Sequence, residues 1–241
     1  MRQIRLSIFF AFLGFALCLN QSAWASPRPL ITFSCGIPSS LPQWQTLLDI
    51  YTKAFDSLGY DFAMTYINTQ RERAELQKSD MLDGSCARKK DFADSNDASK
   101  VVLIDTPVGR SSVSVWRHIG HLHAPLPENM FSEGAKVGYL RGTSIAKLLV
   151  AKQADATLVS FLKPDLGIKT LAAGRVDYWV GFTATVKFLA EKLGLNVAIV
   201  KVANVGTSTL YPFLNKKHKN LVEPLSKELD VIFLERGQLV E

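Results

Sequence analysis

In the first regular part of the chain, segments with the apolar pattern of strands alternate with segments that have the apolar spacing of helices. Residues 29–35 are an apolar-rich run stopped by glycine and proline, which predicts a strand. Between 41 and 58 the apolar positions recur every three or four residues and end just before Gly59, which predicts a helix. Residues 61–66 alternate like a half-buried strand, and the charged stretch 70–78 predicts a shorter helix. This order of elements indicates an α/β unit.

The middle of the chain is less regular. Residues 81–88 predict a short strand that ends in a turn, and the polar stretch 91–100 predicts a surface excursion. Two extended segments follow, at 101–104 and 111–116, before a polar stretch from 118 to 133 without clear periodicity. We expect the chain to cross from one folding unit to another in this region.

From Lys136 onward the pattern becomes regular again. Apolar runs and helical spacings alternate with short connections, which implies parallel strands joined by crossover helices. The predicted strands are 137–140, 156–161, 176–181 and 196–202, and the predicted helices are 145–151, 163–173 and 184–193. An extended segment at 208–214 and an amphipathic helix ending at Gly237 complete the chain. The sequence therefore predicts a second α/β unit.

The N-terminal pattern differs from the rest of the chain. Two arginines precede the apolar run 6–19, and the small-residue signature Ala-Trp-Ala ends at Ala25. This layout predicts a secretory signal over residues 1–25, cleaved after Ala25, and therefore an exported mature protein. The apolar run is too short for a stable membrane span. Cys18 suggests a lipoprotein signal as the alternative, but the bulky Leu17 before it is unsuited to that attachment site.

Length and charge limit the possible functions. Without the signal, 216 of the 241 residues remain, which is enough for one large or two small lobes with proper cores. Lysine and arginine outnumber aspartate and glutamate by 28 to 22 in the full chain. The basic residues are spread out, without the clusters and interleaved aromatics of a nucleic-acid binder. No second long apolar segment is present.

Two cysteines, Cys35 and Cys86, remain after removal of the signal. An even pair in an exported protein is more often a disulfide than a metal or redox site. The two positions are 51 apart, and closing such a loop stabilises the fold by about 4 kcal/mol in the chain-entropy account. We therefore predict a Cys35–Cys86 disulfide, which would brace the pocket wall if both cysteines lie at strand ends.

Residues 137–144, Val-Gly-Tyr-Leu-Arg-Gly-Thr-Ser, lead from an apolar run into a helical pattern. Backbone N–H groups at a helix start favour an anion, Thr143 and Ser144 add hydroxyl donors, and Arg141 adds positive charge. A plain helix cap is the alternative, because serine and threonine cap helices without any ligand. The turn is the first strand-to-helix connection of the second unit, where parallel sheets bind ligands, and this position favours an anion site.

Four segments in order resemble the periplasmic solute-binding proteins of transport systems, in particular the family that includes the polar amino acid binders. They are Phe33–Pro38, the Asp83-Gly84 strand followed by Arg88, residues 137–144, and Leu171–Asp177. The resemblance covers nearly all of the mature chain. It implies an α/β protein with the two-lobed type II fold, each lobe a doubly wound, mostly parallel sheet. We place residues 26–113 and 205–241 in the first lobe and 114–204 in the second.

The resemblance also implies how a ligand would be held. In the amino-acid-binding members, a first-lobe arginine and the glycine-threonine helix start of the second lobe hold the ligand carboxylate, and an aspartate holds the ammonium. Arg88 is our candidate for the arginine, with Arg71 and Arg73 as alternatives. The aspartate position, five residues beyond Asp177, is Phe182. An anion without the ammonium group fits this change, as does an aromatic or mixed ligand packed on Phe182.

The remaining candidates also have plainer interpretations. Trp44 could line the pocket, although its helical spacing favours core packing. His118, His121 and His123 are close enough in sequence to share a metal ion, but no cysteine or carboxylate cluster completes a recognisable site. The sequence contains no nucleophile elbow, Walker loop or dinucleotide glycine pattern.

These patterns favour an exported solute-binding protein that encloses a small anionic or amino-acid-like ligand and delivers it to an ABC-type membrane transporter. We expect a monomer without cofactor or nucleic acid. One alternative is an enzyme on the same scaffold, such as a dehydratase of small cyclic acids. The other is a ligand-sensing module for a membrane receptor.

Overall fold

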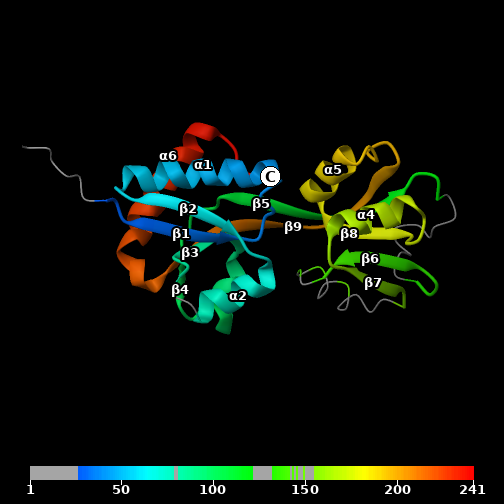
Figure 1. Ribbon diagram of the computed structural model, residues 1–241, viewed down its shortest axis with the longest axis horizontal. Helices are drawn as coiled ribbons and strands as arrows, with labels where there is room; N and C mark the ends of the chain where they lie inside the picture. The colour runs from blue at the N-terminus through cyan, green and yellow to red at the C-terminus, as the bar shows by residue number, and fades with distance from the viewer. Residues whose placement is uncertain are drawn as a thin grey trace, which may run out of the picture.

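The computed structural model describes residues 27–78, 81–121, 132–141 and 155–241, together with Thr143, Ile145 and Leu149. The predicted signal and Ser144 lie outside the described residues. Figure 1 shows two α/β lobes side by side, joined by two long strands that run from one lobe into the other.

The elements of each lobe follow the expected order. The first lobe contains β1 (Leu30–Cys35), α1 (Pro42–Ser57), β2 (Asp61–Tyr66), α2 (Thr69–Lys78), β3 (Gly84–Lys89), the 3₁₀ helices η1 (Lys90–Asp94) and η2 (Asn96–Ala98), β4 (Val101–Leu103), η4 (Lys216–Leu221) and α6 (Val222–Arg236). The second contains β6 (Lys136–Leu140), β7 (Thr157–Phe161), α4 (Pro164–Ala172), β8 (Tyr178–Phe182) and α5 (Thr183–Lys192). Ile145 and Leu149 are also helical. The two shared strands are β5 (Gly109–His118) and β9 (Ile199–Asn215).

One sheet runs through both lobes in the order β2-β1-β3-β9-β5-β8-β6-β7, with β4 also paired to β9. Three strands at each end are parallel to one another, β2-β1-β3 in the first lobe and β7-β6-β8 in the second. The shared strands are antiparallel to each other and to the triplet strand beside them. Each lobe therefore contains a parallel triplet, as the sequence predicts, flanked by antiparallel strands in a mixed sheet.

The pairing fixes the direction of each triplet. β9 runs from the second lobe, where Ile199 pairs with His118, to the first, where Asn215 pairs with Val101. Because β3 is antiparallel to β9, the first triplet runs toward the second lobe. Because β8 is antiparallel to β5, which runs opposite to β9, the second triplet runs toward the first lobe. The carboxyl ends of the two triplets therefore face one another.

Each lobe buries its own apolar clusters. One first-lobe cluster packs α1 and α6 against the sheet around Phe33, Tyr51 and Phe55. On the opposite face, Leu76 of α2 packs with Phe92 and Phe213, so the polar stretch 91–100 also contributes to the core. The second lobe has a cluster around Ile145 and Leu149, and another between α4, α5 and the sheet.

An aspartate joins two strands at the same place in each lobe. Asp83 accepts a hydrogen bond from Thr32 N–H through Oδ2 at 2.8 Å, and its own N–H donates to Thr32 O at 2.8 Å. Asp177 accepts from Lys136 N–H at 2.8 Å and donates to Lys136 O at 2.9 Å. Both aspartates therefore fix the start of the third triplet strand against the first.

Asp83 is also tied to the C-terminal part of the first lobe. Its Oδ1 lies 2.7 Å from His218 Nε2 and 2.8 Å from Lys217 Nζ. Burial acts to raise the pKa of the Asp83 carboxyl, but the hydrogen bonds from Lys217, the Thr32 N–H and His218 outweigh it and lower the pKa. The carboxylate therefore helps to hold β1, β3 and η4 together.

Three glycines make room for the side chain of Trp179, which is 1% exposed. A Cβ on Gly167 would lie 2.0 Å from an indole carbon, and one on Gly138 would lie 2.9 Å from another. A Cβ on Gly181 would lie 2.5 Å from the indole Nε1. Gly138, the first glycine of the 137–144 segment, thus serves core packing.

The main difference from the sequence prediction is β9. The predicted segments 196–202 and 208–214 are parts of a single strand, and it pairs antiparallel to β5. Its middle residues, from Val200 to Tyr211, are all exposed or half-buried because the strand leaves one core before it enters the other. Without burial there is no apolar alternation, so the pattern predicted no strand over residues 203–207.

Candidate functional site

The facing carboxyl ends of the two triplets form the candidate site. In open sheets of this kind, ligands bind outside the carboxyl ends of the parallel strands. On the first lobe these ends are Cys35, Tyr66 and Lys89, and on the second Leu140, Phe161 and Phe182. Tyr66 is 50% exposed, so an aromatic ring is available at the first-lobe edge.

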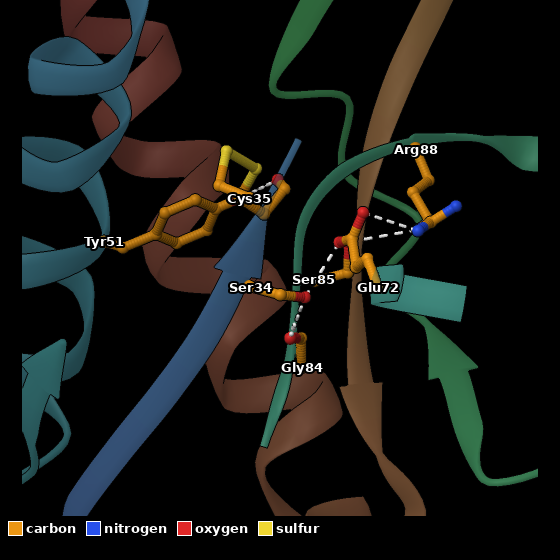
Figure 2. The surroundings of a disulfide bond; sticks show 8 residues. Ser34, Cys35, Tyr51, Glu72, Gly84, Ser85 and Arg88 are labelled. Carbon is orange, nitrogen blue, oxygen red and sulfur yellow. Dashed lines mark hydrogen bonds and ion pairs between the residues drawn. A yellow bond between two sulfur atoms is a disulfide. The ribbon is translucent and has the colours of Figure 1, made fainter. Parts of the chain in front are cut away.

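The predicted disulfide is confirmed. Ser34 pairs with Ser85 in the sheet, and the next residues, Cys35 and Cys86, are joined with a Cα–Cα distance of 5.1 Å. Both cysteines are fully buried, and the hydroxyl of Tyr51 donates to the Cys86 carbonyl. Burial raises the pKa of the Tyr51 phenol, so it stays a neutral donor. Figure 2 shows that the disulfide and Tyr51 lie on one side of β1.

A buried carboxylate holds β1 and β3 together from the other side (Figure 2). Glu72 of α2 is 2% exposed. Its Oε1 accepts from Ser34 Oγ at 2.8 Å and from Ser85 Oγ at 2.6 Å, and its Oε2 lies 2.5 Å from Arg88 Nη2. Sequence analysis missed Glu72, because a glutamate in a charged helix suggests a solvated face. The signal was the set of polar residues at strand ends, which need a buried partner.

Arg88 is committed to this network. It is 7% exposed, its Nε donates to Ser85 Oγ at 3.3 Å, and its guanidinium lies 4.4 Å from the centre of the Phe92 ring. Burial lowers the pKa of the Arg88 guanidinium, and the charge of Glu72 acts to raise it. The Arg88 guanidinium, which we expected to bind a ligand, therefore pairs with the Glu72 carboxylate of the same chain.

Trp44 and Phe182 occupy different surroundings. Trp44 is 8% exposed and belongs to the α1 cluster of the first lobe, in line with its helical spacing. Phe182 is the last residue of β8, half-buried against the Ile145–Leu149 cluster. Of these two aromatics, only Phe182 lies at a carboxyl end that faces the opposite lobe.

The second-lobe turn after β6 carries two of the residues that we expected to bind an anion. Arg141 is exposed, and its N–H donates to Phe161 O at 2.8 Å. Thr143 is half-buried, and its hydroxyl donates to the Leu140 carbonyl at 2.8 Å. Ser144 lies outside the described residues. Arg141 and Thr143 therefore lie together at the edge that faces the first lobe.

Hydroxyl groups line the strands that connect the lobes. Ser112 and Thr207 are paired in register, with their hydroxyl oxygens 3.1 Å apart. Ser114 Oγ lies 2.6 Å from Thr183 Oγ1 in the first turn of α5. The register shifts between Val113 and Ser114, so the pairing is irregular where the chain passes from one lobe to the other.

No metal site is evident in the described residues, where no group of three or more histidine, cysteine or acidic side chains is placed to hold an ion. The rings of His118 and His121 lie 5.1 Å apart, and His118 Nδ1 accepts from Gly120 N–H. His123 lies outside the described residues. Across the same part of the chain, no helix has the length and hydropathy of a membrane span.

Comparison with known proteins places this geometry in context. No family model matches the chain. An uncharacterized protein of Shewanella oneidensis is 24% identical over 95% of this chain and 90% of its own length. A histidine kinase sensor domain with similarity to periplasmic binding proteins has a TM-score of 0.68 at 16% identity, covering 88% of this chain and 92% of that one.

Two arginine-binding proteins are also similar in structure. The arginine-bound form of truncated ArgBP from T. maritima has a TM-score of 0.65 at 15% identity, covering 84% of this chain and 96% of that chain. An ancestral arginine-binding protein bound to glutamine has a TM-score of 0.68 at 16% identity, covering 87% and 94%. The chain has the fold of the periplasmic solute-binding proteins. The two-lobed α/β fold predicted from the sequence is confirmed, whereas the predicted lobe limits remain a prediction.

Proposed function

We propose that this chain is an exported solute-binding protein that encloses a small anionic or amino-acid-like ligand between its lobes and delivers it to an ABC-type transporter. One observation carries the proposal: the carboxyl ends of two parallel strand triplets face one another across two connecting strands. A ligand that touches both ends would favour a closed arrangement of the lobes. In this proposal the lobes divide at 113/114 and 204/205, and the signal is cleaved after Ala25.

On the second lobe, the proposed ligand contacts are Arg141, Thr143, Ser144 and Phe182. On the first, Arg71 is the better candidate for a cation that meets the ligand, because its side chain is 72% exposed near the start of α2. Arg88 and Trp44 then support the site from behind: Arg88 is paired with Glu72, and Trp44 packs in the α1 cluster.

A thermal-shift screen of the purified full chain tests this function. The panel contains arginine, glutamine, glutamate, small organic acids and inorganic phosphate. A ligand that binds only the folded protein raises the melting temperature. At a hundredfold excess over Kd, it stabilises the folded state by about 2.7 kcal/mol. Small-angle scattering of the same mixture should show a more compact molecule. No shift with any class of compound, together with unchanged scattering, would contradict the proposal.

A ligand-sensing role is the second candidate, because a histidine kinase sensor domain shares the fold over 88% of this chain. The two roles differ in the partner of the ligand-loaded protein. Cross-linking in cells that express the full chain, followed by identification of the captured membrane protein, separates them: a transporter permease supports delivery, and a receptor supports sensing.

A further inference from the structure

The first lobe has a surface at the end that points away from the second lobe. The first triplet runs toward the second lobe, so β1, β2 and β3 all begin at this opposite end. β9 finishes there, where Asn215 pairs with Val101, and η4 follows it directly. Figure 1 shows η4, in orange, at the same end as the start of β1. We call the surface made by Leu30, Met81 and η4 the outer surface of the first lobe.

The η4 helix places lysines on this outer surface. Lys216, Lys217 and Lys219 are exposed. Lys216 Nζ donates to the neutral Ser99 carbonyl at 2.7 Å, and Lys217 pairs with Asp83. In the part of the chain that the structure describes, no acid pairs with Lys216 or Lys219. The charges of these two lysines are therefore available to an anion outside the chain.

Most acids at this end of the lobe have basic partners. Arg28 lies 2.6 Å from Asp56 and 3.6 Å from Asp61, and Glu223 pairs at 2.8 Å with a lysine one turn later in α6. Glu228, half-buried on α6, is the exception among the described residues. Asp61 begins β2, three strands away from β9 in the sheet. The lysines of η4 are therefore separated from the acids that Arg28 binds.

Large apolar side chains are exposed beside these lysines. Leu30 is 57% exposed and Met81 is 79% exposed. Each stands two residues before Thr32 or Asp83, which are hydrogen-bonded to one another, so Leu30 and Met81 lie at the entrances of neighbouring strands. Asn215 N–H donates to the Asp83 carbonyl at 2.7 Å, which brings the start of η4 to the same place. Apolar and basic side chains therefore adjoin on the outer surface.

A hollow on the other side of η4 adds further apolar area. The end of β9 lies between β3 and β4, because Leu214 pairs with both strands. On the β4 side is a hollow of about 750 Å³, which Lys219 also lines. Its apolar lining residues, all half-buried, are Leu58, Val102, Val222 and Pro224. Apolar surface thus lies on both sides of the η4 lysines.

The chemistry of this surface and its place in the chain favour a membrane as the partner. Interfacial binding combines burial of apolar side chains with attraction of basic ones to anionic lipids. An acidic protein would need the lysines but not the exposed Leu30 and Met81. The fold begins with β1 at Leu30, close after the predicted cleavage site at Ala25. The outer surface is therefore the part of the fold nearest in sequence to the segment that enters the membrane during export.

We propose that the outer surface of the first lobe binds a membrane surface that contains anionic phospholipid. The contact is weak and reversible, because each lysine near such a surface strengthens binding by about fivefold. It keeps the exported protein close to a membrane partner while leaving the cleft free. The inference does not depend on which ligand the cleft binds.

Co-sedimentation with vesicles tests this inference. The protein is purified after export from cells that express the full chain, and intact mass establishes its N-terminus. It is mixed with vesicles of phosphatidylcholine alone, or of phosphatidylcholine with phosphatidylglycerol. We expect binding to the vesicles with phosphatidylglycerol to be at least about tenfold tighter than to those without, and to weaken as salt is added.

Charge reversal of the free lysines provides the matched comparison. Lys216→Glu with Lys219→Glu should weaken binding to the anionic vesicles by at least about tenfold. The control pair, Lys169→Glu with Lys187→Glu, makes the same change of charge at exposed positions of α4 and α5 in the second lobe, and should bind as the parent does. Met81→Gln changes no charge and should also weaken binding. Circular dichroism melting checks that every variant is folded.

Several results would overturn the inference. They are equal weakening by the two lysine pairs, equal binding to the two kinds of vesicle, and no binding to either. Binding to a polyglutamate peptide but not to the anionic vesicles would do the same, because it would indicate an acidic protein partner. Ligand binding in the cleft is measured separately by the thermal-shift screen, so failure of the proposed function and failure of this inference are distinguishable.

Discussion

At the scale of single residues, the space around Trp179 shows how closely the second lobe is packed. We expect Gly167→Ala to destabilise the protein by about 1–3 kcal/mol, as overpacking of a filled core does. The new Cβ would lie 2.0 Å from an indole carbon that is itself fully enclosed. Urea unfolding followed by circular dichroism measures the change. The matched control is Gly206→Ala, where no atom lies within 4 Å of the new Cβ; equal stability of both variants would contradict the packing described.

Glu72 is a second residue whose role can be measured directly. We expect Glu72→Gln to cost about 3–5 kcal/mol, because it leaves the buried Arg88 charge without a counter-charge. Denaturant unfolding of the variant gives the value. Glu75→Gln is the control on the same helix, since its partner Arg71 is 72% exposed and 3.6 Å away, and such a pair contributes at most about 1 kcal/mol.

The double variant Glu72→Met with Arg88→Met distinguishes a lost charge partner from lost helix packing. Replacing a buried pair by apolar residues of similar size is often neutral. The double variant should therefore recover much of the stability lost in Glu72→Gln. A double variant less stable than the single one would mean that the ion pair, together with the hydrogen bonds from Ser34 and Ser85 to Glu72, stabilises the first lobe.

The lowered pKa of the Asp83 carboxyl leads us to expect that the stability of the protein decreases in acid. Its pKa is lower in the folded protein than in the unfolded chain, so its contribution is present above the unfolded value of about 4 and is lost as pH falls through the folded value. Stability should decrease in acid more steeply for the parent than for Asp83→Asn. Parallel pH profiles, from urea unfolding between about pH 7 and pH 3, would show that Asp83 does not act through its charge.

At the scale of elements, the disulfide joins the end of β1 to the middle of β3 in a protein whose sheet already pairs these strands. The Cys35→Ser, Cys86→Ser double variant should lose about 2–5 kcal/mol, as small exported domains do without a native disulfide. Thermal unfolding measures the loss. In the parent, reductant should act slowly below the melting temperature because both cysteines are fully buried. Rapid reduction of the native protein would contradict this burial.

Elements that bury one apolar face could be predicted from the sequence. Segments that are exposed, and buried residues that are polar, could not. The spacing from 41 to 58 predicts α1 because Trp44, Leu47 and Tyr51 are buried against one cluster. β9 lacks such a pattern in its middle, so its continuity could not be predicted. Glu72 could not be recognised because a buried carboxylate and a solvated one look alike within a charged helix.

Within the site, the sequence predicted some positions and not their partners. Cys35 and Cys86 could be paired because they are the two cysteines outside the predicted signal. The position of Arg88 after a strand favoured a ligand contact, but the carboxylate that holds it comes from α2, 16 residues earlier. Contacts between elements of this kind require the fold, since no local spacing encodes them.

At the scale of the whole molecule, β5 and β9 connect two lobes that have separate buried clusters. The connecting part is irregular: the register shifts at two places in β5, and no residue from Val200 to Tyr211 of β9 is buried. Ser112 and Thr207 make a side-chain bond there at an exposed position. Backbone hydrogen bonds with little burial open at low free energy.

Hydrogen exchange should therefore divide the shared strands into segments. Amides of residues 111–113 and 203–208, none of which is buried, should exchange faster than those of Phe33–Cys35 in β1 and Tyr178–Gly181 in β8, which are all buried. If a ligand holds the lobes together, its addition should slow exchange in these segments more than in either core. Equal protection along β5 and β9 would mean that the lobes move as one body, and a ligand would then have to enter a preformed site without hinge closure.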